Sequence, residues 1–390
     1  CIGLVHSNNS IISNCVLLNS HYGIGTFESN NITINSCDIS NHVNYGIYLH
    51  NTSNSLINSC FVHNNSLYGI AIGYHSNYNT ISSCNIYENT YGGIGIGDSS
   101  KNIIKNCTIH NSIYTYYSHT AILLDNSSNN TIESCLIHDV RGDGISFFNS
   151  SSNTIRSCKL YNFGNNGIDF QFSCNNLIES CQISNTLYSI YLEDSSNNTI
   201  DSCNISSWGS GICFFHYSYD NKILSSRIYD SPAGISLSRH ADFNLIKDTE
   251  LSNNQCGIVI HSALNNTIDS CMIYNNSYCG ITLDRGSNFY TSIDNTIKAC
   301  TISNNEVGIF LDISSYESNL IYHNNFINNV EHANDSLNGA WYNGLIEQGN
   351  YWDDYTGVDE NGDGIGDTPY NISEGDNKDY YPLMKPYELP

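Results

Sequence analysis

The feature that most constrains the fold of this chain is a motif that recurs mostly every 22 to 24 residues. Each copy has a cysteine, serine or threonine at one position, which we call the motif anchor. An isoleucine stands three residues before the anchor, and an aliphatic residue stands two residues after it. Repeats this short can bury a core only by stacking on one another, so a kept aliphatic position predicts a continuous buried column. The isoleucines of this column are Ile12, Ile34, Ile57, Ile81, Ile104, Ile132, Ile155, Ile178, Ile200, Ile223, Ile246, Ile268 and Ile297.

The second half of each copy predicts short strands rather than helices. It reads Gly-Ile-x-apolar in most copies, as in Gly144–Phe147 and Gly167–Phe170, and such alternation is strand periodicity. Asn, Ser and Gly between the apolar runs favour tight turns. We therefore predict an all-β, right-handed parallel β-helix of about fourteen coils over residues 1–330. Insertions near Ser112–His119 and Arg285–Ser292 predict projecting loops.

The cysteines define a second column. Eleven of the 16 stand at the motif position that follows the isoleucine by three residues. We predict reduced thiols that pack there as small apolar side chains. A disulfide ladder is the alternative, but stacked side chains that point in parallel hold their Cβ atoms too far apart for relaxed disulfide geometry. A metal-binding column is disfavoured, because Cys-x-x-Cys spacing is missing.

Charge narrows the class of partner. The chain has 13 Lys and Arg against 37 Asp and Glu, a net charge of −24, which argues against nucleic acid as a partner because that needs a basic footprint. No apolar run approaches the roughly 18–20 residues of a membrane-spanning helix. The sequence begins at Cys1 in repeat register, so we expect a processed piece without its targeting segment. Asn-x-Ser/Thr sequons, as at Asn31 and Asn371, would suit an extracellular or cell-surface glycoprotein.

Residues 331–390 predict an irregular C-terminal cap that holds a calcium loop. Residues 359–367 read Asp-Glu-Asn-Gly-Asp-Gly-Ile-Gly-Asp, which matches the spacing of an EF-hand loop. The glutamate expected at the twelfth position is replaced by Tyr370, so other oxygens, such as those of Asp353 and Asp354, would complete the shell. The predicted ligands of a structural calcium ion are Asp359, Asn361, Asp363, the carbonyl of Ile365, and Asp367.

The same C-terminal region resembles a known family. The segment 349–355 reads Gly-Asn-Tyr-Trp-Asp-Asp-Tyr, and with the 359–367 loop and Tyr381-Pro382-Leu383 it is similar to the end of NosD-like proteins. The resemblance implies a right-handed β-helix of the archaeal cell-surface type, with repeats also found in carbohydrate-binding proteins and sugar hydrolases. The copper-binding label of that family is not carried over, because no His, Met and Cys cluster has copper spacing.

Two groups of side chains are candidates for chemistry or binding. The catalytic candidates are His138, Arg141, Asp143 and Asp169, because a sugar-active enzyme needs an acid and a base together. Asp169 alternates with the apolar Ile168 and Phe170 and is expected to face solvent. The ligand-binding candidates stand three residues after the motif anchor, where rings on a flat sheet would stack on sugars: His63, Tyr87, His110 and Tyr161.

These observations lead to one expected function and one alternative. We expect an exported, non-catalytic β-helix scaffold for adhesion or carbohydrate binding, with a polysaccharide or a cell-surface glycan as its partner. The alternative is a polysaccharide lyase, glycoside hydrolase or epimerase that acts in a lateral groove of the β-helix.

Overall fold

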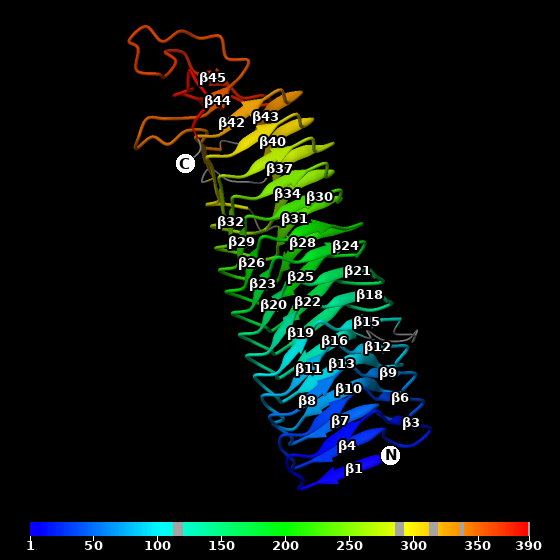
Figure 1. The fold of residues 1–390 in the computed structure, drawn as a ribbon. Coiled ribbons are helices and arrows are strands. Elements are labelled where there is room, and N and C mark those ends of the chain that lie inside the picture. The colour runs from blue at the N-terminus through cyan, green and yellow to red at the C-terminus, as the bar shows by residue number, and fades with distance from the viewer. Residues whose placement is uncertain (112–119, 285–291, 312–318, 336–338, 389–390) are drawn as a thin grey trace. The chain divides into compact units, whose positions relative to one another are not determined.

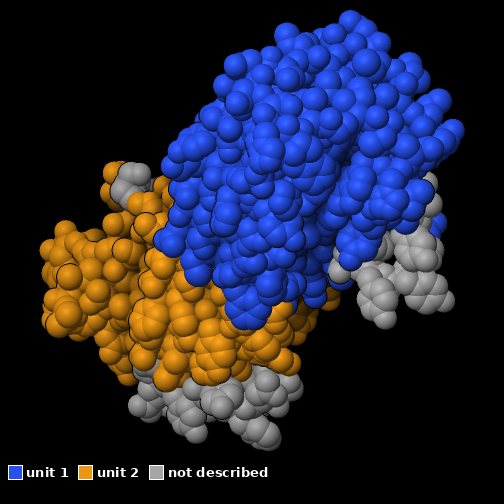
Figure 2. Space-filling model, turned by 90° about the horizontal axis from the view of Figure 1, so that it is seen from below, with its two compact units in different colours: residues 1–191 blue, residues 192–390 orange. Residues whose placement is uncertain are grey.

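The computed structural model describes residues 1–111, 120–284, 292–311, 319–335 and 339–388. The two predicted insertion loops lie almost entirely outside these residues. The described part of the chain contains strands and no helix, and therefore no helix that could cross a membrane. Its strands form three parallel sheets, which confirms the predicted all-β solenoid of about 14 turns (Figure 1). The chain divides into two compact units, Cys1–Tyr191 and Leu192–Pro390, which Figure 2 colours separately.

In the first unit each coil adds one short strand to each sheet, and strands of successive coils pair side by side. The first sheet contains β1 (Ile2–Val5), β4 (Ile24–Phe27), β7 (Ile47–His50), β10 (Tyr68–Gly73), β13 (Gly92–Gly97), β16 (Thr120–Asp125), β19 (Ile145–Phe148) and β22 (Ile168–Gln171). The second sheet contains β2 (Ile11–Ser13), β5 (Thr33–Asn35), β8 (Leu56–Asn58), β11 (Thr80–Ser82), β14 (Ile103–Lys105), β17 (Thr131–Glu133), β20 (Thr154–Arg156) and β23 (Leu177–Glu179). The third sheet contains β3 (Val16–Leu18), β6 (Asp38–Ser40), β9 (Phe61–His63), β12 (Asn85–Tyr87), β15 (Thr108–His110), β18 (Leu136–Val140), β21 (Lys159–Phe163) and β24 (Gln182–Ser184).

The second unit repeats this plan, and β25 (Ile190–Glu193) spans the boundary between the units. Its first sheet contains β28 (Ser210–Phe215), β31 (Ala233–Ser238), β34 (Cys256–His261), β37 (Cys279–Asp284), β40 (Val307–Leu311) and β43 (Glu331–Asp335). The second sheet contains β26 (Thr199–Asp201), β29 (Lys222–Leu224), β32 (Leu245–Lys247), β35 (Thr267–Asp269), β38 (Thr296–Lys298) and β41 (Leu320–Tyr322). The third sheet contains β27 (Asn204–Ser206), β30 (Arg227–Tyr229), β33 (Glu250–Ser252), β36 (Met272–Tyr274), β39 (Thr301–Ser303), β42 (Asn325–Ile327) and β44 (Tyr351–Trp352), and a small hairpin pairs β45 (Tyr370–Asn371) with β46 (Lys378–Asp379).

The predicted isoleucine column forms the core. Like residues pair from coil to coil, as in Ile132 with Ile155 and Ile246 with Ile268. These side chains are buried because successive coils cover one another, which is the stacking that the repeat predicts. Phe147 and Phe170 add a stacked aromatic pair with ring centroids 4.7 Å apart.

The cysteines mark the bend between the second and third sheets. The residue before each anchor adopts a left-handed backbone, as Ser134 does at φ 53°, so the chain turns there without a longer loop. The thiol of Cys135 donates to the carbonyl of Glu133 at 3.4 Å and lies 3.8 Å from that of Ile104 in the preceding coil. Neighbouring carbonyls thus engage these thiols, and their predicted reduced state stays a prediction.

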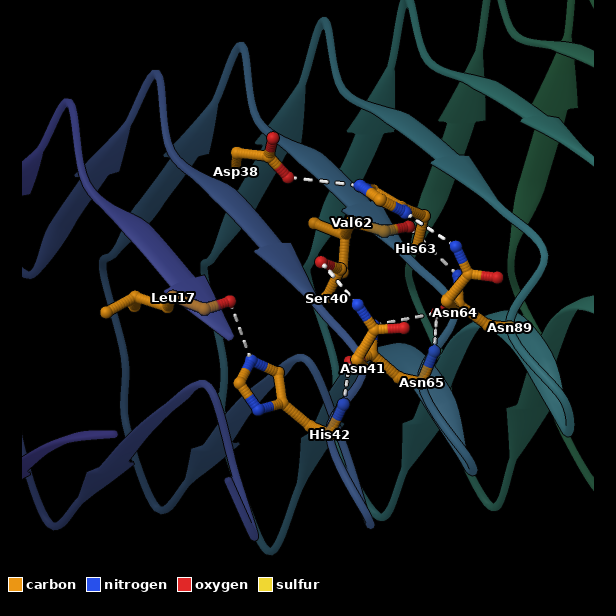
Figure 3. A network of polar contacts seen from close by, with 10 residues as sticks. All are labelled: Leu17, Asp38, Ser40, Asn41, His42, Val62, His63, Asn64, Asn65 and Asn89. Carbon is orange, nitrogen blue, oxygen red and sulfur yellow. Dashed lines mark hydrogen bonds and ion pairs between the residues drawn. The ribbon is translucent and has the colours of Figure 1, made fainter. Parts of the chain in front are cut away.

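Buried asparagines form ladders that the sequence did not reveal. The backbone N–H of Asn65 donates to Oδ1 of Asn89 at 3.1 Å, and Asn89 donates to the carbonyl of Val62 at 3.0 Å (Figure 3). A second ladder links Asn130 to Asn153 at 2.8 Å. Buried backbone groups at turns need such partners, so these asparagines are structural, although the sequence suggests only turn residues.

The last coils close differently from the rest. Trp341 and Trp352 are fully buried, with ring centroids 5.9 Å apart. Asp379 accepts hydrogen bonds from the backbone N–H of Asn350 at 2.7 Å, from Nε1 of Trp352 at 3.0 Å, and from the N–H of Tyr381 at 3.0 Å. Strands β43 and β44 still pair with coil strands in this region, and the predicted boundary at residue 331 stays a prediction.

Candidate active site on the outer face of the first sheet

Two of the four catalytic candidates share one buried polar cluster. Asp143 lies in the turn before β19, and Asp169 lies on β22 in the next coil. Asn166 joins them: its backbone N–H donates to Oδ1 of Asp143 at 2.9 Å, and its Nδ2 donates to Oδ1 of Asp169 at 3.2 Å. Gln171 also donates to Asp169, at 3.1 Å. We call Asp143, Asn166 and Asp169 the carboxylate cluster.

The environment of the cluster favours proton retention on one carboxyl. Burial raises the pKa of Asp143, and hydrogen bonds from the Asn166 N–H and from Asn165 oppose only part of this shift. Both bonds end on Oδ1, so Oδ2 is the oxygen that can carry a proton. Oδ1 of Asn166 is buried and has no hydrogen-bond partner among the described residues. A buried acceptor without a partner is unusual, and a bound hydroxyl group could satisfy it.

The expectation that Asp169 faces solvent is wrong. Its side chain does point away from the core, since the flanking Ile168 and Phe170 are fully buried on the inner face, yet Asp169 is only 3% exposed. Ser146, which pairs with it in register, and Gln171 pack against its carboxylate. Alternation along the strand predicts the outward direction of the side chain correctly. It does not predict that side chains around Asp169, including one from the neighbouring coil, cover the carboxylate.

The other two catalytic candidates lie elsewhere. His138 is on β18 of the third sheet, where its Nδ1 lies 2.6 Å from Oδ2 of Asp139. Arg141 is exposed in the turn between β18 and β19, two residues before Asp143. The structure therefore brings Asp143 and Asp169 together, places Arg141 at the edge of their face, and leaves His138 on another sheet.

Glycines and tyrosines shape the neighbouring outer face of the first sheet. The ring of Tyr68 lies over the next strand, because a Cβ on Gly92 would be 2.6 Å from Cε1 of that ring and a Cβ on Gly95 would be 3.0 Å from Cδ2. On the same sheet, burial raises the pKa of Tyr48 on β7 to about 12, and it also raises the pKa of Asp125 on β16. Oδ1 of Asp125 is buried and has no hydrogen-bond partner among the described residues. Sequence reasoning missed this surface, although the run 92–97, Gly-Gly-Ile-Gly-Ile-Gly, signals a strand without bulky outer side chains.

The predicted ligand-binding rings form one continuous stack on the third sheet. The stack runs from His63 through Tyr87, His110 and His138 to Tyr161. Its successive ring centroids lie 4.6, 5.3, 5.0 and 5.0 Å apart. Because the rings are nearly parallel and cover one another, they present edges rather than faces to solvent. His63 also pairs with Asp38 at 3.0 Å (Figure 3). Sugar binding at this column stays a prediction, and it would use ring edges and polar atoms.

The predicted calcium loop has the backbone of a tight acidic turn. Oδ1 of Asp359 accepts from the N–H of Gly362 at 2.7 Å, and its Oδ2 accepts from that of Gly364 at 2.9 Å. Both glycines have left-handed backbones, which a residue with a Cβ adopts at a penalty. Oδ1 of Asp363 accepts from the N–H of Ile365, and Oδ2 of Asp367 accepts from that of Glu360. Side-chain oxygens gathered inside a loop suit a hard cation.

Asp353 and Asp354, which were expected to complete the calcium shell, contact other side chains in the structure, and their role as calcium ligands stays a prediction. Nε2 of His332, a buried side chain, lies 2.8 Å from Oδ1 of Asp353 and 3.5 Å from Oδ1 of Asp354. Tyr370 donates to the other oxygen of Asp354 at 3.2 Å. His332, Asp353 and Asp354 form one of two groups among the described residues that could hold a metal ion. The other group is Glu193, Asp194 and His216.

Calcium binding to the 359–367 loop is expected to give measurable heat and to raise the melting temperature of the chain. Asp363→Ala should abolish both effects, because it removes the carboxylate ligand at the fifth position of the loop. Glu360→Ala is the matched control, since its side chain is exposed and outside the predicted ligand set. Equal calorimetric heats for the wild type and for Asp363→Ala would contradict calcium binding at this loop.

The fold and its polar outer face define a parallel β-solenoid protein with candidate sites on its sheets. The chain belongs to the family described as the right handed beta helix region, whose model matches residues 1–103, 93–242 and 188–346. Comparison with curated proteins finds no match.

Solved structures share this fold at low sequence identity. The A-module of a mannuronan C-5 epimerase from Azotobacter vinelandii is 13% identical, with a TM-score of 0.56 over 81% of this chain and 86% of that one. A periplasmic alginate epimerase is also 13% identical, with a TM-score of 0.56 over 79% and 77%. A mannuronic acid-specific family 6 polysaccharide lyase from the human gut microbiota is 9% identical, with a TM-score of 0.54 over 82% and 87%.

These comparisons overturn the expectation of a non-catalytic scaffold. The structures that share the fold are epimerases and a lyase of polysaccharides, which favours the alternative of a polysaccharide-modifying enzyme over the scaffold. Identities this low establish the fold alone and assign no activity to this chain. The expectation failed because the motif records inward residues, whereas chemistry on a β-helix depends on outward residues that vary from coil to coil.

Proposed function

We propose that this chain is a polysaccharide-modifying enzyme whose reaction site is the carboxylate cluster on the outer face of the first sheet. The observation that carries the proposal is the pairing of Asp143 and Asp169 through Asn166, with both carboxyls buried. Two carboxyl groups in different surroundings can divide the roles of acid and base. Action on a polymer also suits the predicted location outside the cytoplasm, and the C-terminal motif supports a NosD-like origin for the chain.

Asp143 is the general acid in this proposal. Its raised pKa keeps a proton available, and its Oδ2 would donate that proton to a glycosidic oxygen as the bond breaks. Asp169 would act opposite to it, as the carboxylate that activates water or attacks the sugar carbon. Asn166 positions both groups, and its free Oδ1 would accept a hydrogen bond from a sugar hydroxyl.

The charge of this face favours hydrolysis of a neutral polysaccharide. Elimination and epimerisation at C5 of a uronate remove a proton beside a carboxylate, and a nearby cation eases this by stabilising the developing charge. The first-sheet strands β1 to β22 of the first unit contain no Lys or Arg. Arg141 lies in the turn before β19 and not on a strand of this sheet. A neutral chain would meet the carboxylates without charge repulsion, and tyrosine rings farther along the same sheet, such as Tyr48 on β7, suit sugar contacts.

The proposal is tested by incubating the full chain with a panel of neutral and uronate polysaccharides. We expect new reducing ends from a neutral polymer, because hydrolysis releases one at each cleaved bond. Ultraviolet-absorbing unsaturated sugars, or a changed uronate epimer ratio by NMR, would still support a polysaccharide-modifying enzyme but would contradict hydrolysis. No product from any polymer would contradict the proposed function.

A further inference from the structure

Two cysteines outside the motif column meet on the outer face of the second unit. Cys256 begins β34 and Cys279 begins β37, and the two residues are register partners in adjacent strands. Their Sγ atoms lie 2.8 Å apart, with the thiol of Cys279 donating to Cys256. Cys279 is fully buried, whereas Cys256 is partly exposed.

This contact differs from the contacts of the motif cysteines. A motif thiol such as Cys271 donates to the carbonyls of Asp269 and Ile246, at 3.4 and 3.7 Å, and also lies beside the sulfur of Cys300 in the next coil. The Cys279 thiol instead donates directly to the sulfur of Cys256, at the 2.8 Å given above. Adjacent strands lie about 4.8 Å apart, which falls inside the Cα separation of about 4.4–6.8 Å that a disulfide spans.

We propose that Cys256 and Cys279 form a redox-active dithiol that closes to a disulfide by exchange with a small-molecule disulfide. Cys256 is the attacking sulfur because it is the exposed member of the pair. The hydrogen bond from Cys279, with a smaller contribution from His261, lowers the pKa of Cys256 and so favours its thiolate. The hydrogen bond to Cys256 and, next to it, burial raise the pKa of Cys279, which keeps that residue a thiol until it resolves the first adduct.

The exchange balances in two steps when oxidised glutathione is the oxidant. The Cys256 thiolate attacks one glutathione sulfur, so a mixed disulfide forms and one glutathione thiolate leaves. Cys279 then loses its proton and attacks Sγ of Cys256, which expels the second glutathione. The dithiol is thereby oxidised by two electrons, and one glutathione disulfide is reduced to two thiols.

The test treats the folded full chain with oxidised glutathione, then denatures it and alkylates the remaining thiols. We expect the thiols of Cys256 and Cys279 to be lost together without retained glutathione, whereas the exposed Cys1 and the half-buried Cys15 and Cys174 are followed separately as glutathione adducts by mass. Chymotryptic cleavage after Tyr274 places the two cysteines on separate peptides, and mass spectrometry should find those peptides linked. Alkylation of both Cys256 and Cys279 after the treatment, or a link between other cysteines, would overturn the proposal.

Single variants separate the attacking and the resolving sulfur. Cys279→Ser should accumulate a stable glutathione adduct on Cys256, because no second sulfur displaces it. Cys256→Ser should leave Cys279 free of glutathione, because Cys279 is buried, and Cys213→Ser should still form the link. Circular dichroism confirms that each variant is folded. Equal thiol loss in the Cys256→Ser and Cys279→Ser variants would also contradict the proposal.

Discussion

Asp169→Asn is expected to lower the turnover of a polysaccharide substrate by about 10²–10⁴-fold, the usual contribution of a positioned acid or base. The substitution keeps the size of the side chain and an oxygen to accept from Asn166, but removes the negative charge. Some loss of stability is expected as well, because Asn166 and Gln171 donate to different oxygens of Asp169 whereas asparagine offers a single acceptor oxygen, and circular dichroism checks that the variant is folded. The measurement is the initial rate of reducing-end release on the polymer that the wild type cleaves.

Asp143→Asn should produce a loss of similar size with a different pH signature. Since burial raises the pKa of Asp143, wild-type turnover should decline as pH rises through that pKa and the proton is lost. The variant has no carboxyl to titrate, so its residual activity should lack that decline. Glu179→Gln is the control, because Glu179 lies on β23 of the second sheet. If both aspartate variants keep wild-type rates, the carboxylate cluster is not the reaction site.

Asp379→Ala is expected to destabilise the C-terminal region by about 3–5 kcal/mol, since each buried donor left unpaired costs about 1–3 kcal/mol. Alanine would leave the backbone N–H groups of Asn350 and Tyr381 and the indole N–H of Trp352 without a hydrogen-bond acceptor. Two of the three tryptophans, Trp341 and Trp352, are buried in this region, so their fluorescence during urea unfolding reports the loss.

The same variant has a defined pH dependence. Burial raises the pKa of Asp379 to about 6, although hydrogen bonds from Asn350 and Trp352 partly oppose the shift. The folded state therefore binds this proton more tightly than the unfolded state, whose value is near 3.8. As pH falls through about 6 toward 4, the wild type gains stability that the variant does not. The gap between them should widen at low pH.

An exposed aspartate is the control for both measurements. Asp376→Ala removes a carboxylate three residues away that is exposed to solvent, so the midpoint of unfolding should stay within error of the wild type. A matching loss of stability in both variants would show that general surface charge, rather than the hydrogen bonds of Asp379, supports this region.

How much the sequence predicted depends on which face of the strand is considered. Ile132 and Ile155 were assigned to the core from spacing alone, because an inward position must be apolar in every coil and the repeat makes that requirement visible. Asp359 and Asp363 were placed in one loop because their neighbours in the chain are also their neighbours in space. The carboxylate cluster was only half predicted: Asp143 and Asp169 were named, but Asn166 was not, and His138 was grouped with them although it lies on another sheet.

The sequence by itself determined the solenoid, its coil length and the inward columns, since one short motif specifies the burial of every coil. Only the tertiary structure decided that Asp169 is covered, that the rings of His110 and His138 turn their faces to one another, and that Cys256 meets Cys279. The physical reason is the stacking of coils. Residues some 22 or more positions apart in the chain become neighbours, as Ser146 and Asp169 do. Most outward side chains follow no repeat, and even the recurring ring position does not reveal how its rings lie against one another.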